Sequence, residues 1–214
     1  MILDDFKGYI FDLDGTLVDS FDVWNTVDRL FLSKRGFAVP ENYGKEMSAM
    51  GFDSAAEYTI KRFGLNDKKS DIIDEWNETA TKLFENEVFL FEGVREYLIK
   101  LKKKGKKLGI ATASHRGLTD PCLKNNDVLE LFDSIVTVYD VNRGKDFPDI
   151  YLKAADEMGL KSSECVVFED VPKAIRGAKL GGFKTVAFIS YGNIYDSEEL
   201  IRLSDKYIEG YNEL

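Results

Sequence analysis

The chain has 214 residues, of which 44% are hydrophobic and 13% aromatic, so it can bury one large core or a core with an insertion, and disorder is excluded. Its 29 Lys and Arg residues against 38 Asp and Glu residues give a formal net charge of −9, which argues against nucleic acid as the main partner. The longest apolar runs fall far short of the ~20 residues of a membrane-spanning helix, so no membrane partner is expected.

The cysteine and histidine contents narrow the possible chemistry further. Cys122 and Cys165 are too few for a disulfide framework or a four-sulfur zinc site, and we find no secretory leader, so a reducing, cytoplasmic location is expected. The single histidine, His115, excludes metal sites built from several histidines. No pattern in the sequence indicates an oligomeric state.

Short apolar runs alternate with helical stretches along most of the chain. The runs that we expect to be strands are Tyr9–Phe11, Lys107–Thr112, Ser134–Val138, Cys165–Phe168 and Thr185–Ile189. The helices expected among them are Val94–Lys104, Pro148–Met158 and Val171–Leu180. Strands that are apolar throughout and alternate with helices indicate a parallel sheet covered on both faces. The predicted fold class is therefore α/β.

Residues 20–88 break this alternation. They carry helical patterning without a strand-like run, beginning with Phe21, Trp24, Val27 and Phe31 on one stripe. A block of this length is too long for one crossover between strands. We therefore expect a helical domain at 20–88, inserted into a core formed by residues 1–19 and 89–214.

Polar side chains follow four of the expected strands. Ligands bind at the carboxyl ends of the strands in an open parallel sheet, so these residues should share one crevice. Four carboxylates there would repel one another, and a divalent cation together with a lysine would compensate. Ligation by oxygen atoms alone suits Mg²⁺. The residues concerned are Asp12, Asp14, Thr112, Lys145, Glu169 and Asp170.

Four motifs in order resemble the haloacid dehalogenase-like hydrolase superfamily, whose members are mostly phosphatases and phosphomutases. Together they are strongly specific and cover nearly the whole chain. They are residues 11–20 (Phe-Asp-Leu-Asp-Gly-Thr-Leu-Val-Asp-Ser), residues 110–114 (Ile-Ala-Thr-Ala-Ser), Lys145 with residues 148–151 (Pro-Asp-Ile-Tyr), and residues 166–170 (Val-Val-Phe-Glu-Asp). Residues 91–94 (Phe-Glu-Gly-Val) resemble the return from an inserted helical cap. The resemblance thus implies a Rossmann-like core with a helical cap domain.

The resemblance also implies roles for the carboxylates. Asp12 would be the nucleophile that becomes an aspartyl phosphate. Asp14, two residues on, would protonate the leaving oxygen and later deprotonate the attacking water. Mg²⁺ would be held by Asp12, by the backbone carbonyl of Asp14 and by Asp170, with Glu169 ligating it directly or through water.

The phosphoryl oxygens need a separate set of donors. Thr112 and Lys145 would supply a hydroxyl and a fixed positive charge, assisted by backbone N–H groups of Leu13, Asp14 and Ala113. Taken alone, Thr112 could equally be a strand-end hydroxyl bonded to backbone, and Lys145 a solvated lysine. Likewise, Glu169 and Asp170 could cap the helix that follows them, a role compatible with metal binding.

Substrate choice should depend on the inserted helical cap, because the core would hold only the phosphoryl group. The stretch 43–52 contains turn-forming glycines and is expected over the crevice, which makes Lys45 and Ser48 candidate specificity residues. Trp24 is a third candidate, although aromatic residues at helical spacing are more often core. His115, just after the second motif, is a fourth candidate, and loop polarity explains it equally well.

We predict a Mg²⁺-dependent phosphatase acting on small organic phosphate monoesters. The alternative within the family is a β-phosphoglucomutase-like sugar phosphomutase. Thr16 stands where that subgroup usually carries valine, Trp24 stands where it usually carries a histidine, and residues 50–53 lack its arginine, so the mutase is disfavoured. A haloacid dehalogenase would leave Asp14 and the Glu169–Asp170 pair without a task, and an inactive phosphate-binding regulator would be expected to lose Asp12 or Asp14.

Overall fold

The computed structural model describes residues 3–47, 50, 52–191 and 195–214. The chain divides into two compact units: a core unit of residues 1–19 and 89–214, and a helical unit of residues 20–88. No helix in the described ranges is long and apolar enough to cross a membrane.

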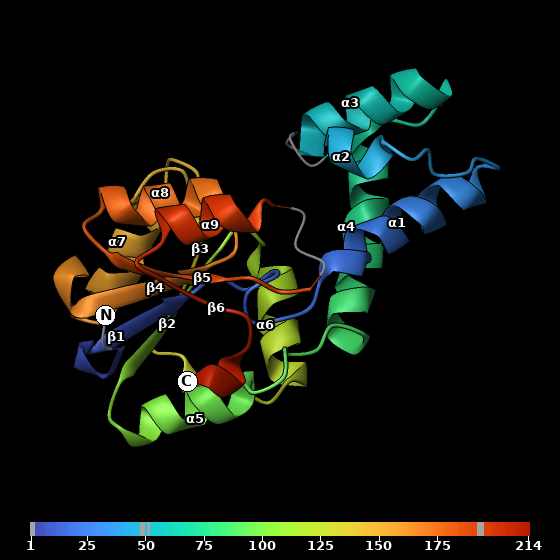
Figure 1. Ribbon diagram of the computed structural model, residues 1–214. Helices are drawn as coiled ribbons and strands as arrows, with labels where there is room; N and C mark the ends of the chain where they lie inside the picture. Colours follow the sequence, from blue (N-terminus) through green and yellow to red (C-terminus); the bar gives the residue numbers. More distant parts are fainter. Residues whose placement is uncertain (1–2, 48–49, 51, 192–194) are drawn as a thin grey trace. The chain divides into compact units, whose positions relative to one another are not determined.

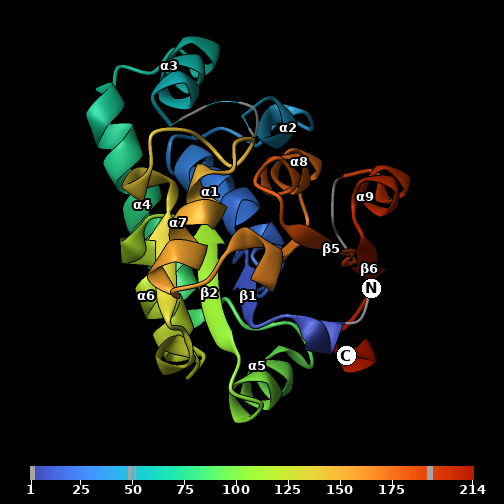
Figure 2. The ribbon, with the colours of Figure 1, turned by 90° about the vertical axis from the view of Figure 1, so that its left-hand side faces the viewer.

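The core unit is built on a six-stranded sheet in the order β3-β2-β1-β4-β5-β6, and every neighbouring pair is parallel. The strands are β1 (Gly8–Phe11), β2 (Lys107–Thr112), β3 (Ser134–Thr137), β4 (Cys165–Glu169), β5 (Lys184–Phe188) and β6 (Lys206–Ile208). The five expected strands are present to within one residue at each end. The edge strand β6 was not expected, and it lies beside β5 (Figure 2).

Helices cover both faces of the sheet, as Figure 1 shows. One face carries α5 (Val94–Lys103) and α6 (Arg116–Asn125), and the other carries α7 (Asp149–Glu157), α8 (Pro172–Leu180) and α9 (Ser197–Leu203). This arrangement follows from right-handed crossovers that run outward from β1 in opposite directions. The order of the strands therefore reverses between β1 and β4, where open α/β sheets bind their ligands.

Alternation along the central strand β1 builds two separate cores. Ile10 packs with Ile150 and Tyr151 of α7 in an apolar cluster on one face. On the other face, Phe11 packs against the ring of Phe168 with centroids 4.7 Å apart. Both faces of β1 are fully buried, which holds its carboxyl end rigidly in place.

The described residues of the helical unit form four helices that pack on one another. They are α1 (Phe21–Lys34), α2 (Tyr43–Met47), α3 (Phe52–Phe63) and α4 (Lys69–Asn86). Its core is aromatic, with Phe31 and Trp76 in edge-to-face contact at 5.5 Å. Residues 43–47 form a helix rather than the turn-rich stretch that we expected, since buried Tyr43 is anchored to Thr59 of α3 by a hydrogen bond of 2.6 Å.

Candidate active site

The loop after β1 carries the first two candidate residues. The backbone N–H of Asp12 still donates to Phe168 of β4, at 3.0 Å, and the carbonyl of Leu13 then accepts from Leu17 and Val18. Gly15 has a φ of +76°, a conformation that glycine adopts without strain, so the loop can turn back on itself here. Asp12 is buried and Asp14 half-buried at this turn.

Lys145 joins the ends of β1 and β4. Its Nζ donates to Asp12 Oδ1 at 2.5 Å and also forms an ion pair with Glu169 Oε1. Burial alone would lower the pKa of Lys145, but the Asp12 and Glu169 carboxylates outweigh it and raise that pKa, so the lysine stays charged. A permanent cation therefore lies between two carboxylates.

Glu169 and Asp170 lie at the end of β4, immediately before α8, whose N-cap residue is Val171. Glu169 is completely buried, and Tyr151 Oη donates to its Oε1 at 2.9 Å. Asp170 Oδ1 accepts from Thr16 Oγ1 at 3.3 Å. Burial, reinforced by the nearby Asp12 charge, raises the pKa of both carboxyls, which indicates that this cluster requires a positive charge to be fully ionised.

The same carboxylates can hold a metal ion. One oxygen of each of Asp12, Glu169 and Asp170 lies within 4.8 Å of the other two. Glu169 Oε2 is buried without a hydrogen-bond partner among the described residues, and an unsatisfied buried oxygen is costly unless a ligand meets it. The donor set contains oxygen only. These residues therefore fit a hard divalent cation such as Mg²⁺.

Two hydroxyl side chains at the end of β2, those of Thr112 and Ser114, connect this strand to the β1 loop by hydrogen bonds. Thr112 is fully buried and its Oγ1 accepts from the backbone N–H of Ser114 at 3.0 Å. Ser114 Oγ in turn donates to Asp14 Oδ2 at 2.7 Å. This side chain orients the predicted acid Asp14, whereas Ala113 between the two is exposed.

Sequence reasoning missed three of these contacts. Ser114, Tyr151 and Thr16 all stand inside the motifs quoted above, yet the pattern assigned them no partner. Ser114 and Thr16 bond to residues that lie 100 and 154 positions away in the chain. The contact of Tyr151 depends on how α7 is rotated about its own axis. Neither property can be read from the sequence pattern. The available signal was a hydroxyl side chain inside each of these motifs.

Of the four predicted specificity residues, one lies in the core unit, two belong to the helical unit, and one falls outside the described residues. His115 is the N-cap residue of α6, and its ring meets exposed Tyr139 edge-to-face at 6.5 Å. Trp24 belongs to the helical unit, where its partly exposed ring contacts Phe52 at 5.6 Å. Lys45 lies in α2, and Ser48 falls outside the described residues. The structure therefore tests no role in substrate choice for these four residues.

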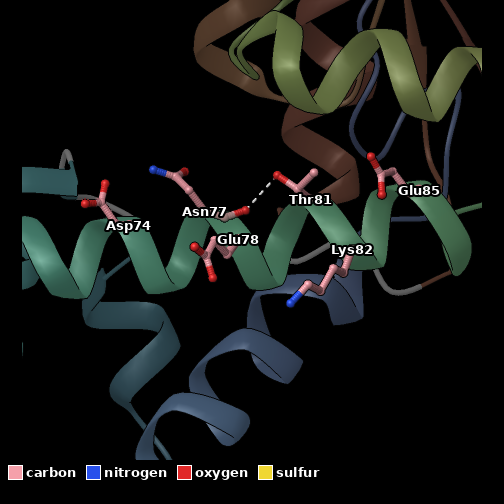
Figure 3. Close-up of a pocket in the computed structure, with 6 residues that line it drawn as sticks. All are labelled: Asp74, Asn77, Glu78, Thr81, Lys82 and Glu85. Atoms are coloured by element: carbon pink, nitrogen blue, oxygen red, sulfur yellow. Dashed lines mark hydrogen bonds between the residues drawn. The ribbon is translucent and has the colours of Figure 1, made fainter.

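A surface hollow on the helical unit shares no residue with the carboxylate cluster. It is lined by side chains from α4 alone (Figure 3): Asp74, Asn77, Glu78, Thr81, Lys82 and Glu85. The Thr81 hydroxyl donates to the backbone carbonyl of Asn77, and most of the charged residues are acidic. This surface has no lysine paired with carboxylates from several elements, and so differs in kind from the cluster at the sheet.

The fold and this cluster define the class of protein: an α/β enzyme with carboxylates at the switch point of a parallel sheet and an inserted helical domain. A family model described as haloacid dehalogenase-like hydrolase matches residues 9–188. The chain belongs to this family, as the motifs predicted, and it is an enzyme of the phosphoric monoester hydrolase class.

Individual relatives agree with this assignment. The chain is 29% identical over 181 residues to Bacillus subtilis YhcW, provisionally named a phosphatase, covering 84% of this chain and 82% of that protein. It is 24% identical over 179 residues to hexitol phosphatase B of Escherichia coli, covering 83% and 81%. A crystal structure from Thermotoga maritima, provisionally assigned as a β-phosphoglucomutase, has the same fold, with a TM-score of 0.84, 22% identity and coverage of 96% and 95%.

Proposed function

We propose that this protein is a Mg²⁺-dependent phosphatase that hydrolyses small organic phosphate monoesters through an aspartyl-phosphate intermediate. The observation that carries the proposal is the convergence of Asp12, Lys145, Glu169 and Asp170 at the carboxyl ends of β1 and β4. A carboxylate nucleophile, a fixed cation and an oxygen-lined cation site are the groups that phosphoryl transfer from a monoester requires.

Asp12, Asp170 and the backbone carbonyl of Asp14 would hold the Mg²⁺, with Glu169 ligating it directly or through water. When bound, the cation would offset the carboxylate charge and neutralise charge that develops on the phosphoryl oxygens. Glu169 Oε2 is buried and has no hydrogen-bond partner within the part of the chain that the structure describes, which supports this assignment.

In the first step an Asp12 carboxylate oxygen attacks phosphorus, the P–O bond to the organic group breaks, and Asp14 gives its proton to the departing oxygen. In the second step Asp14 takes a proton from water, which attacks the phosphorus of the aspartyl phosphate and regenerates Asp12. The Ser114 hydroxyl bond to Asp14 supports a fixed orientation for this acid and base. Lys145 and Thr112, with the backbone N–H groups of Leu13 and Ala113, would bind the phosphoryl oxygens.

The proposed substrate class is small organic phosphates, and the relative named hexitol phosphatase B supports it. Trp24, Lys45, Ser48 and His115 are the residues that we propose to influence which organic group is accepted. We also propose a cytoplasmic location, since Cys122 and Cys165 are both free and buried thiols.

Removal of the metal tests the central claim. We expect EDTA to abolish hydrolysis of an aryl phosphate and added Mg²⁺ to restore it, because the uncompensated carboxylates would repel the phosphate dianion. Asp12→Asn should lower turnover by at least about a thousandfold while phosphate-analogue binding persists. Asp5→Asn, at an exposed aspartate of the turn Leu3–Asp5, is the matched control and should leave turnover unchanged. Full hydrolysis of the aryl phosphate in EDTA would contradict the proposed requirement for Mg²⁺.

A second measurement separates the phosphatase from a β-phosphoglucomutase-like mutase. A mutase must keep water away from the aspartyl phosphate while a bisphosphate intermediate reorients. We expect phosphate release without a bisphosphate activator, and ¹⁸O from solvent water in the released phosphate. Conversion of β-glucose 1-phosphate to glucose 6-phosphate faster than phosphate release would establish the mutase instead.

A further inference from the structure

Tyr211 connects a distant part of the chain to the loop that carries the candidate nucleophile. It lies in the short turn Tyr211–Glu213, and its side chain is almost completely buried. Its Oη donates to the backbone carbonyl of Thr16 at 3.2 Å. Thr16, also buried, then donates from Oγ1 to Asp170 Oδ1 at 3.3 Å. Two hydrogen bonds in series thus link residue 211 to a carboxylate of the proposed metal site.

The turn that carries Tyr211 is held in place from several sides. Asn212 Nδ2 donates to Glu92 Oε1 at 3.3 Å, and Lys100 Nζ donates to the carbonyl oxygen of Leu214 at 2.5 Å. A Cβ on Gly93, whose φ is +83°, would lie 3.1 Å from the backbone nitrogen of Asn212. The turn therefore lies directly against the start of α5, which limits its movement.

The ring of Tyr211 is fixed independently of its hydroxyl. It packs against Phe188, Tyr97 and Phe168 with centroid distances of 5.2, 5.8 and 6.2 Å. These contacts would persist if the side chain lost only its oxygen. The hydroxyl therefore contributes chiefly the bond to Thr16, and its loss can be tested without dismantling the core.

We propose that Tyr211 is a positioning residue for the metal site, acting through Thr16 to hold the β1 loop and Asp170 in register. The inference rests on the proposed function, because it assigns a purpose to the orientation of Asp170. Asp12 follows β1 and Asp170 follows β4, so a hydrogen bond between the β1 loop and Asp170 fixes their separation. Tyr211 supports that hydrogen bond from outside both segments.

Tyr211→Phe and Tyr9→Phe form a matched pair of tests. Tyr9 is buried in the same aromatic cluster, 6.4 Å from Phe168, and its hydroxyl also donates to a backbone carbonyl, that of Leu3, at 2.6 Å. Residue 3, however, precedes β1 and is far from its carboxyl end. We expect Tyr211→Phe to weaken Mn²⁺ binding, measured by electron paramagnetic resonance, by about fivefold, the effect of losing one hydrogen bond. Tyr9→Phe should leave Mn²⁺ binding unchanged.

The route through Thr16 is tested by combining variants. Thr16→Val should weaken Mn²⁺ binding at least as much as Tyr211→Phe, and Thr16→Ser should restore it. If Tyr211 acts through Thr16, the double variant Tyr211→Phe/Thr16→Val should bind Mn²⁺ as Thr16→Val does. Full additivity, or unchanged Mn²⁺ binding in Tyr211→Phe, would overturn the proposal.

Turnover separates this inference from the proposed function. Wild-type protein that binds Mn²⁺ with the expected variant pattern but hydrolyses no phosphate ester would refute the proposed function and retain the positioning role of Tyr211. If the protein hydrolyses phosphate esters but Tyr211→Phe does not change its Mn²⁺ affinity, the positioning role of Tyr211 is refuted and the proposed function is retained. A wild-type protein that binds no Mn²⁺ would refute the positioning proposal, because Asp170 would then have no metal to hold.

Discussion

Lys145 is the residue on which the charge balance of the site depends. It is paired with both Asp12 and Glu169 in a buried setting, so its removal leaves carboxylates facing one another without compensation. We predict that Lys145→Met lowers the free energy of unfolding in EDTA by about 3 kcal/mol, as for other broken buried pairs. Mg²⁺ should recover part of this loss, and thermal unfolding with and without the ion measures it. Equal destabilisation with and without Mg²⁺ would show that the bound cation does not compensate for the lost charge of Lys145.

Gly177 allows the Lys145 loop to approach α8. A Cβ at this position would lie 2.0 Å from the Lys145 carbonyl oxygen, so alanine forces the loop to shift. Gly177→Ala should therefore reduce turnover by tenfold or more and lower stability by about 1–3 kcal/mol, although alanine favours helices by ~1 kcal/mol. The control is Gly44→Ala in α2, where the nearest atom is 3.5 Å away and only the helix preference should act. A stabilised, fully active Gly177→Ala would contradict this packing argument.

At the residue scale, sequence reasoning reached the charged groups and Thr112 but missed the other hydroxyl groups of the site. Asp12, Lys145, Glu169 and Asp170 were predicted to meet because each follows a strand end, and the structure brings them together. The hydroxyl partners Tyr151 and Ser114 depend instead on rotamers and helix rotation. Strand ends can be read from hydropathy, whereas rotamers are decided by packing.

At the element scale, the predicted strands were those with continuous apolar runs. β6 was not predicted because it lacks an apolar run. Only Ile208 of its three residues is buried, which is typical of an edge strand with one exposed side. α6 was not predicted either, because Gly117 and Pro121 interrupt its sequence and both disfavour a helix. Burial of Leu118 and Leu123 stabilises the helix despite these two residues.

Asn126, just after α6, joins that helix to the segment where the chain returns to the core unit. Its Oδ1 accepts from the backbone N–H of Leu90 at 3.1 Å, and its Nδ2 donates to the Cys122 carbonyl at 2.9 Å. Because the Asn126 side chain is buried, we predict that Asn126→Ala costs about 1–3 kcal/mol of unfolding free energy in urea titrations. The neighbouring exposed Asn125→Ala should cost less than about 0.5 kcal/mol. Similar effects for both variants would show that the Leu90 contact is energetically unimportant.

At the scale of the whole molecule, two units with separate cores share one chain. The core unit carries the carboxylate cluster, and the helical unit is held by its aromatic residues and by Arg35, which pairs with Asp67 and Glu75. The length of the insertion was readable because 20–88 lacks any strand-like run. The internal packing of its helices depends on side-chain contacts that hydropathy does not encode.

Asp28 gives the helical unit a pH dependence of its own. It is a buried carboxyl on α1, and burial raises its pKa to about 7, whereas an unfolded aspartate titrates near ~3.9. The folded chain therefore keeps a proton that the unfolded chain loses, so this group lowers the free energy of unfolding as pH rises from about 4 to about 7, and adds no further change above that.

Asp28→Asn imitates the protonated carboxyl and should remove this decline, stabilising the protein by about 1 kcal/mol or more at pH 8 and hardly at pH 4. Chemical unfolding between pH 4 and pH 8 measures the difference, with exposed Asp22→Asn on the same helix as the control. A constant effect of Asp28→Asn across this range would show that Asp28 is ionised throughout in the folded chain.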